Sequence, residues 1–289
     1  MCHLWHVSGS SCSHTGAKKV DCNTAPNSTT KKGKRIPAFR FASWNVRTMC
    51  PGLSEDLTQF NDSRKTAIIN NKLSRLDVDI AALQETRLPA SGSLREQGYT
   101  FFWQGRDPEE PRQHGVGFAI RNSLLSMIEP PSNGSERILS IRLFTASGLV
   151  HLLSIYAPTL CSPHEDKDQS YEELHNIISS IPNTEHLFLL GDFNARVGAD
   201  HDSWLSCLGR FGIGRMNENG QRLLELCTYH NLCITNSFFH TKPCHQVSWR
   251  HPRSRHWHQL DLIVTRQASL NSVQITRSFC SGAAQWRSG

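Results

Sequence analysis

Residues 187–190 form an uninterrupted apolar run, Leu-Phe-Leu-Leu, which ends at a glycine. Because successive side chains of a strand point to opposite faces, this run predicts a strand with apolar layers packed on both faces. Asp192 and Asn194 follow at once, and their spacing places both on the same side of an extended segment. Asp and Asn at such a position are typical of a turn, and the two polar groups can also reach one shared target.

From residue 38 onward, strand patterns and helix patterns follow one another without a linker or an internal repeat. Helical spacing of apolar residues predicts three helices, at 63–76, 168–181 and 219–232. Strand patterns bounded by turn residues occur at 39–46, 78–85, 99–105, 115–122, 137–144, 149–158, 187–190, 233–239, 246–251, 258–265 and 272–276. Helices interspersed among many strands predict one domain, residues 38–289, with the fold of a layered α/β (α+β) sandwich.

The first 37 residues differ from the rest of the chain. They carry Ser, Thr, Asn, Lys and Gly with little apolar periodicity, which predicts a disordered basic N-terminal arm. The arm ends in a basic cluster, KKGKR (Lys31–Arg35). Such a cluster is typical of nucleic-acid contact, of a nuclear import signal or of a solvated tail.

Composition excludes several classes of protein. The chain has no run of about eighteen apolar residues that would span a membrane, and its first residues lack the pattern of a secretory signal. Its ten cysteines are scattered without a C-x-x-C pair, which predicts reduced thiols. The net charge of +6 favours a polyanionic partner. We therefore expect a protein of the nucleus or cytoplasm that is not secreted and has no membrane partner.

Polar side chains recur at the ends of the predicted strands, and one lies inside a strand. The set contains two amides, three carboxylates and a phenol: Asn45, Asn194, Glu85, Asp192, Asp261 and Tyr156. Each has an ordinary explanation by itself, such as a capped turn or a satisfied buried aspartate. In α/β proteins, however, ligands collect at the ends of strands.

The chemistry that suits this set is attack on a phosphodiester. A hard divalent cation takes one or two carboxylates and keeps several waters, and Glu85 fits that role. Asp192 is a candidate base for a nucleophilic water. Asn194 and Tyr156 are candidate donors to the charge that develops on the phosphoryl oxygens.

Five motifs occur in a characteristic order: SWNVR, LQETR, IYAP, GDFNARVG and QLDLI. In this order they resemble the endonuclease/exonuclease/phosphatase superfamily, and most closely the craniofacial development protein 2-like proteins and the endonuclease domains of LINE-type retrotransposons. The resemblance covers about residues 39–287. It implies a four-layer sandwich of two packed mixed sheets flanked by helices, and cleavage of phosphodiester bonds with Mg²⁺ or Mn²⁺.

The resemblance also implies roles for individual residues. Glu85 would be the principal metal ligand, with Asn45 beside it orienting the site. Tyr156 would contact the scissile phosphate, Asp192 would activate the attacking water and Asn194 would steady the transition state. A residue at the position of Asp261 holds a histidine in the family. We therefore expect the catalytic set Asp192, Asn194, Tyr156 and Asp261, and the metal set Glu85 and Asn45.

The family closes with a Ser/Thr-Asp-His triplet beyond the position of Asp261, followed by a last strand. Here neither Asp nor His follows Asp261, and Arg287, Ser288 and Gly289 stand where the triplet is expected. The resemblance thus implies a C-terminally truncated domain without its final strand and with impaired nuclease activity, since loss of one member of a catalytic unit costs several powers of ten in rate. The alternatives are an inactive, retroelement-derived protein that binds nucleic acid or another partner, and a truncated product without stable function.

A basic, aromatic stretch precedes Asp261. Cations mixed with aromatic rings suit phosphate contact and base stacking. The expected nucleic-acid contacts are Arg87, Arg250, Arg253, Arg255 and Trp257, with DNA favoured over RNA and the protein acting as a monomer. Three histidines of the stretch, His251, His256 and His258, are candidates to replace the absent one. The stretch is otherwise a plain surface turn, or a zinc site that includes Cys244 and His245.

Overall fold

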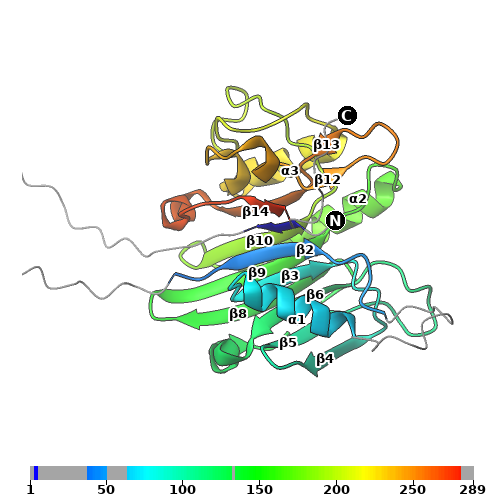
Figure 1. Cartoon of the computed structure of the whole chain (residues 1–289). Coiled ribbons are helices and arrows are strands. Elements are labelled where there is room, and N and C mark those ends of the chain that lie inside the picture. The colour runs from blue at the N-terminus through cyan, green and yellow to red at the C-terminus, as the bar shows by residue number, and fades with distance from the viewer. Residues whose placement is uncertain (1–2, 6–37, 51–63, 132–133, 281–289) are drawn as a thin grey trace, which may run out of the picture.

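The computed structural model of the protein describes residues 3–5, 38–50, 64–131 and 134–280. Two mixed β-sheets pack face to face, and helices cover both outer faces (Figure 1). The predicted sandwich of two packed sheets between layers of helix is confirmed. The basic cluster of the N-terminal arm lies outside the described residues, and so do residues 281–289, where the Ser/Thr-Asp-His triplet was expected.

The first sheet has five strands in the order β2-β3-β6-β5-β4. Strands β2 and β3 are parallel, and the remaining pairs are antiparallel. Helix α1 (Lys65–Arg75) covers its outer face. Its strands are β2 (Phe41–Asn45), β3 (Ile80–Gln84), β4 (Ser91–Arg95), β5 (Tyr99–Gln104) and β6 (Val116–Arg121).

The second sheet has six strands in the order β11-β14-β10-β9-β8-β7. Strands β9 and β10 are parallel, and the other pairs are antiparallel. Helices α2 (His164–Ser180) and α3 (Glu218–Tyr229) pack on its outer face. Its strands are β7 (Ile128–Glu129), β8 (Ile138–Thr145), β9 (Gly148–Tyr156), β10 (His186–Asp192), β11 (Leu232–Ile234) and β14 (Asp261–Arg266).

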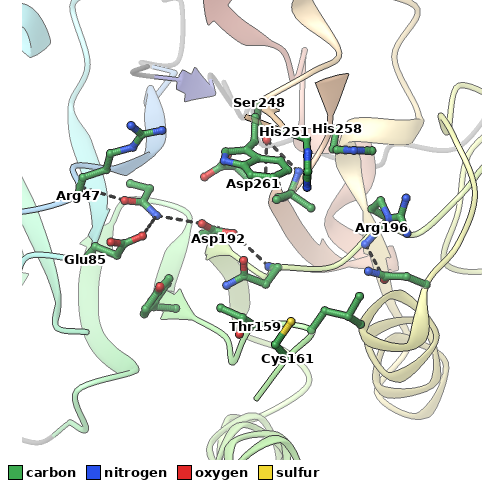
Figure 2. Close-up of a pocket in the computed structure, with 17 residues that line it drawn as sticks. Arg47, Glu85, Thr159, Cys161, Asp192, Arg196, Ser248, His251, His258 and Asp261 are labelled. Carbon is green, nitrogen blue, oxygen red and sulfur yellow. Dashed lines mark hydrogen bonds between the residues drawn. The ribbon is translucent and has the colours of Figure 1, made fainter. Parts of the chain in front are cut away.

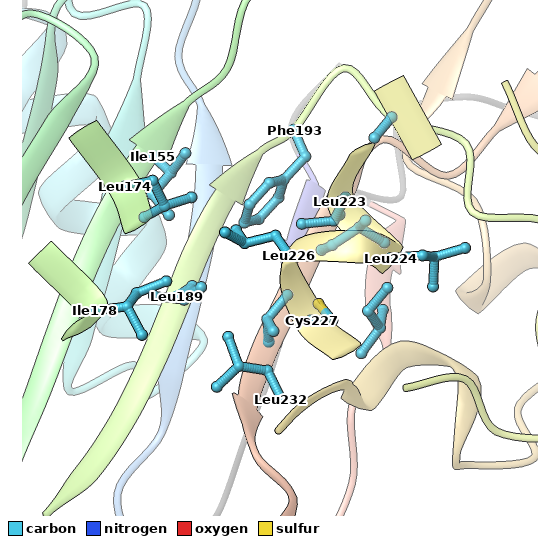
Figure 3. Packing of buried hydrophobic residues seen from close by; sticks show 14 of the residues in the cluster. Ile155, Leu174, Ile178, Leu189, Phe193, Leu223, Leu224, Leu226, Cys227 and Leu232 are labelled. Carbon is cyan, nitrogen blue, oxygen red and sulfur yellow. The ribbon is translucent and has the colours of Figure 1, made fainter. Parts of the chain in front are cut away.

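The apolar run of β10 lies between two hydrophobic layers, as its sequence predicted. Leu187 and Leu189 pack toward α2 and α3, whereas Phe188 and Leu190 enter the core between the two sheets. Phe193 continues the outer layer beside α3 (Figure 3). The alternation follows from the two-residue period of a strand. It fixes which side chains of the following turn face the core and which face the sheet edge.

Two local devices hold the turn after β10. A Cβ at Gly191 would clash with the carbonyl oxygen of Ile155 on β9, so only glycine allows this close approach. Further on, the Asn217 side chain caps the start of α3 by accepting from the Gly220 N–H at 2.8 Å. The same Oδ1 accepts from the Arg196 N–H at 2.9 Å. The cap therefore ties the chain after β10 to the first turn of α3.

Shorter elements complete the described chain. A two-stranded hairpin, β12 with β13, precedes β14, and β1 pairs antiparallel with β15 beside β2. The residues of β1 fall within the predicted arm. The elements are β1 (His3–Trp5), β12 (Trp249–Arg250), β13 (Trp257–His258), β15 (Ser278–Cys280) and the 3₁₀ helices η1 (Asn122–Met127), η2 (Thr235–Ser237), η3 (Pro243–His245) and η4 (Gln267–Ser272).

Two predictions of local structure were wrong, and one strand was missed. Residues 272–276 do not form a strand, because η4 ends there and an irregular segment follows. The strand predicted at 233–239 stops at Ile234 and turns into η2. Strand β4 was not predicted, because its sequence, SGSLR, is polar and alternates between exposed and half-buried positions at the edge of the sheet.

Candidate active site

The polar residues at the strand ends meet at one rim of the sandwich. A cavity of about 500 Å³ is lined by residues from both sheets. Asn45, Tyr156 and Asp192 are the last residues of β2, β9 and β10, and Asp261 is the first residue of β14. Glu85 and Asn194 follow β3 and β10. In Figure 2, Glu85, Asp192 and Asp261 point toward one another across this space. The structure thus brings together all six residues that sequence patterns singled out at strand ends.

The amide of Asn45 joins the two sheets across the cavity. Its Nδ2 donates to Glu85 Oε1 at 2.7 Å and to Asp192 Oδ2 at 3.0 Å. Its Oδ1 accepts from the backbone N–H of Arg47 at 3.0 Å, which fixes the side-chain rotamer. Both Nδ2 protons are therefore shared between two carboxylates, one from each sheet. Asn45 holds these carboxylates at a set separation.

Glu85 lies on a strained loop that its backbone partners stabilise. Both Glu85 and Arg87 adopt a left-handed φ of 53°, which non-glycine residues rarely adopt. Hydrogen bonds of Thr86 N–H to Gly115 and of Arg87 N–H to His114 pin the loop, at 3.0 and 2.9 Å. The Arg87 guanidinium donates to Glu85 Oε2 at 2.7 Å. Arg87, which we expected to contact nucleic acid, therefore contacts Glu85, the expected metal ligand.

Asp192 serves both of the uses that its sequence position allowed. Its Oδ1 accepts from the Asn194 N–H at 3.1 Å, which is the hydrogen bond of a local turn. Its Oδ2 faces the cavity and accepts from Asn45. Asn194, at a left-handed φ of 47°, donates through Nδ2 to the Ala157 carbonyl at 2.9 Å. Burial raises the pKa of Asp192, although the hydrogen bonds from Asn45 and Asn194 oppose the shift.

Asp261 lies directly opposite Asp192 across the antiparallel β10–β14 ladder. Such pairs place their side chains on the same face, within about 5 Å at Cβ. The Asp261 side chain is 5% exposed, and its Oδ1 has no hydrogen-bond partner among the described residues. Burial and then the charge of Asp192 raise its pKa well above the ordinary value. The resemblance implied that Asp261 orients a histidine. Within the described chain, no histidine donates to Asp261 Oδ1.

Tyr156 is held by two residues that sequence reasoning missed. The rings of His114 and Tyr156 lie 5.8 Å apart, and the Arg137 guanidinium lies 5.8 Å from the Tyr156 ring. Arg137 also contacts His114 Nε2 at 3.3 Å and donates to the Tyr156 carbonyl at 3.2 Å. Burial and the Arg137 charge lower the pKa of His114 to about 4, so it is neutral at pH 7. Burial and the Glu85 charge raise the pKa of Tyr156, which keeps its phenol protonated.

The β12–β13 hairpin borders the cavity on the side away from Glu85 (Figure 2). The Trp249 ring stacks on His258 at 5.8 Å and meets His251 edge-on at 5.3 Å. Both histidines line the cavity, whereas His256 is exposed and does not. Burial lowers the pKa of His258. Of the three candidate replacement histidines, the structure thus places two beside the strand-end residues.

The hairpin carries three exposed arginines that we call the hairpin arginines: Arg250, Arg253 and Arg255. Arg250 and Arg255 line a second hollow, next to the first cavity, and share it with Arg47. The Arg250 guanidinium lies over the ring of Trp257 at 5.7 Å. Cations and rings therefore lie together beside the carboxylate cavity. Their contact with nucleic acid stays a prediction.

The donor set fits a hard cation better than zinc. Mg²⁺ accepts oxygen ligands and is commonly held by only one or two carboxylates with waters. Glu85 offers such a carboxylate at the cavity wall. No group of three or more His, Cys, Asp or Glu side chains suited to a metal occurs in the described part of the chain. The zinc site suggested around Cys244 and His245 is therefore not formed there.

A sandwich of two mixed sheets between helices, with carboxylates and amides gathered at one rim, defines the phosphodiesterase-type fold of metal-dependent nucleases. The sequence pattern of the Endonuclease/Exonuclease/phosphatase family matches residues 42–284. The chain belongs to this family, which confirms the resemblance drawn from its five motifs. Among its described residues, none of the helices has the length and apolar character needed to cross a membrane.

Three comparisons show what the chain is similar to. It is 28% identical to craniofacial development protein 2 of Bos taurus over 240 residues, which are 83% of this chain and 38% of that protein. The endonuclease domain of TRAS1, a telomere-specific non-LTR retrotransposon, matches with a TM-score of 0.51 at 15% identity, over 81% of this chain and 87% of that domain. An AP endonuclease from Archaeoglobus fulgidus matches with a TM-score of 0.54 at 17% identity, over 80% and 88%.

These comparisons differ in what they establish. At 15–17% identity, the solved structures establish the shared fold and nothing more. The chain spans about 38% of the length of the curated relative. The activity and partners of that larger protein therefore do not transfer to this chain as findings.

Proposed function

We propose that this protein is a phosphodiester hydrolase of the endonuclease type that depends on Mg²⁺ or Mn²⁺ and acts on nucleic acid, DNA more readily than RNA. The observation that carries the proposal is the convergence of Asn45, Glu85, Tyr156, Asp192 and Asn194 on one cavity of about 500 Å³. Membership of the family supports the reaction class. The basic hairpin beside the cavity supports a polyanionic substrate.

In this proposal the chain's residues divide the reaction among them. Glu85 would hold the cation, which when bound supplies charge to polarise the phosphoryl group. Asp192 accepts a proton from the attacking water. Burial raises the pKa of Asp192, which makes its carboxylate a better base. Asn194 and the protonated phenol of Tyr156 donate to the phosphoryl oxygens. Asn45 keeps Glu85 and Asp192 in register through its bridging amide.

Asp261 sets the expected rate. In the family its position orients a histidine, and here its buried Oδ1 accepts no hydrogen bond from any described residue. We therefore expect slow turnover. A second candidate function, nucleic-acid binding without cleavage, is favoured by the same observation, because the hairpin arginines do not depend on Asp261.

Nicking of supercoiled plasmid tests the proposal. We expect slow conversion to the open circle with Mn²⁺ or Mg²⁺, complete inhibition by EDTA, and a loss of about 10²–10⁴ in rate for Asp192→Asn. Glu85→Gln should also remove activity. Arg142→Gln, on strand β8, is the control for the preparation and should match the parent chain. Nicking that survives Glu85→Gln would refute the metal-dependent reaction, whereas salt-sensitive binding without nicking would establish the second candidate.

A further inference from the structure

The carboxylate of Glu85 is engaged on both of its oxygens. Asn45 Nδ2 lies 2.7 Å from Oε1, and Arg87 Nη2 lies 2.7 Å from Oε2. A cation that binds Glu85 must share the carboxylate with these donors, and the positive charge of the Arg87 guanidinium repels it. Binding of the cation therefore competes with one of the two nitrogen donors.

Asn45 is not the donor that leaves. Its side chain also contacts Asp192 and the Arg47 backbone, and its own backbone belongs to strand β2. Releasing Asn45 from Glu85 would disturb contacts in both sheets. Its hydrogen bond to Glu85 is also compatible with a cation on the opposite oxygen.

Arg87 has the opposite character. Its backbone is fixed, since its N–H donates to His114 at 2.9 Å and its carbonyl accepts from Cys50 Sγ at 3.0 Å. Its side chain is 46% exposed, against 17% for Glu85, and within the described residues its guanidinium has one hydrogen-bond partner, Glu85. The guanidinium can therefore leave Glu85 by a change of side-chain rotamer alone.

A released guanidinium needs another anion. Arginine pairs with phosphate through the same planar fork that it presents to a carboxylate. The Arg87 guanidinium is one contact away from the cavity that would hold the phosphodiester, because it donates to Glu85, which lines that cavity. A backbone phosphate of the nucleic acid is the anion that would reach this point.

We propose that Arg87 is an internal counter-ion that closes the cation site of the free protein, and that it moves to a substrate phosphate when the cation binds Glu85. This inference rests on the proposed function. Because linkage between two binding sites is reciprocal, cation and nucleic acid then strengthen each other's binding. The protein binds its cation weakly until a polyanion is present to accept the displaced guanidinium.

The test is Mn²⁺ affinity, measured by electron paramagnetic resonance of the free ion without nucleic acid. We expect Arg87→Gln to bind Mn²⁺ roughly twofold to fivefold more tightly than the parent, the range expected for loss of a partly exposed competing ion pair. Arg47→Gln is the matched control. Arg47 lines the same cavity as Glu85, and its replacement removes the same charge but leaves the contact between Arg87 and Glu85 intact, so it should change Mn²⁺ affinity less than twofold.

The second measurement is binding of a fluorescent DNA duplex by anisotropy, with and without Mn²⁺ at constant ionic strength. In the parent, Mn²⁺ should tighten DNA binding by a factor similar to the affinity gained in Arg87→Gln. In Arg87→Gln the Mn²⁺ effect should disappear, whereas Arg47→Gln should keep it. A denaturing gel confirms that the duplex remains intact.

The possible failures are distinguishable. In one outcome, Arg87→Gln binds Mn²⁺ no more tightly than the parent, and Glu85→Gln does not bind it. This result would overturn the counter-ion role of Arg87 and leave the proposed metal site in place. In another outcome, neither the parent nor Arg87→Gln binds Mn²⁺, or Glu85→Gln still binds it. This result would overturn both the counter-ion role and the proposed metal site. Thermal melts of each variant exclude loss of the fold as the cause.

Discussion

Replacing Asp261 by Asn should make this protein more stable at neutral pH. Asp261 is buried directly opposite Asp192, and its Oδ1 accepts no hydrogen bond from the described residues. The hydroxyl of Ser248 accepts from the Leu260 and Asp261 backbone N–H groups, at 2.8 and 3.0 Å. Hydrogen bonds from Ser248 and the backbone lower the pKa of Asp261, but burial and the charge of Asp192 outweigh them. A buried carboxylate with one unsatisfied oxygen beside another carboxylate opposes folding. Asn keeps the side-chain volume and removes the charge.

The sign of the pH dependence follows from the raised pKa of Asp261. The folded state holds the proton more tightly than the unfolded state, whose Asp pKa is about 3.9. The contribution of this group to stability is therefore fully present below that value and is lost as pH rises through the folded pKa. Each unit of upward shift corresponds to about 1.4 kcal/mol. Because Asn does not titrate, its advantage grows over the same range.

The size of the effect follows from the burial of one unsatisfied group. Such a group costs about 1–3 kcal/mol. We therefore expect Asp261→Asn to raise the free energy of unfolding by this amount at pH 7.5. In a domain of this size, each kcal/mol shifts the melting temperature by ~2–4 °C.

Thermal melts at pH 7.5 and pH 4.5, in EDTA to exclude metal ions, provide the assay. The melting temperature of Asp261→Asn should exceed that of the parent at pH 7.5, and the gain should shrink at pH 4.5. Asp200→Asn is the control, because the bonds from Ser203 lower the pKa of this exposed carboxyl. It should lose a little stability at pH 7.5. No gain for Asp261→Asn, or a gain that is undiminished at pH 4.5, would show that the Asp261 carboxylate is compensated in solution.

Two further predictions concern the core and the hairpin. Phe193→Ala should lower the free energy of unfolding in denaturant by about 3–5 kcal/mol, because this 1% exposed residue fills the layer beside α3. The control, Phe144→Ala, replaces a residue that is 53% exposed and should change the free energy of unfolding by less than about 0.5 kcal/mol. Equal losses in the two variants would refute this packing. Changing the hairpin arginines together to Gln should lower the slope of log K against log salt for duplex DNA by about 0.9 for each phosphate that is no longer neutralised. Arg142→Gln should leave the slope unchanged, and an unchanged slope in the triple variant would remove the hairpin from the interface.

Much of the fold was predictable because its signals are local. The period-two alternation of β10 is enough to assign Leu187 and Phe188 to different apolar layers, and the structure confirms two such layers. Helix α3 was predicted from its apolar spacing in the same way. The polar edge strand β4 was missed because an edge position, unlike a central one, does not demand an apolar pattern.

The candidate site was predictable only as a set of residues. The strand ends identified Glu85 and Asp192 because polar residues there interrupt apolar runs. No comparable signal marks His114 or Arg137. They belong to none of the five motifs, and both contact the ring of Tyr156. Their contact depends on a loop that follows β5 and on the residue before β8, two segments that the sequence alone does not bring together.

The sequence by itself determined the family, the layered sandwich and the identity of the strand-end residues, because motifs and periodicity are written in contiguous residues. Only the tertiary structure decided which side chains pair with one another. The amide of Asn45 lies between Glu85, 40 residues away, and Asp192, 147 residues away, and the Arg87 guanidinium donates to Glu85. Such contacts arise from the packing of one sheet on another, and no local pattern encodes the distance between two strands that meet only across a core.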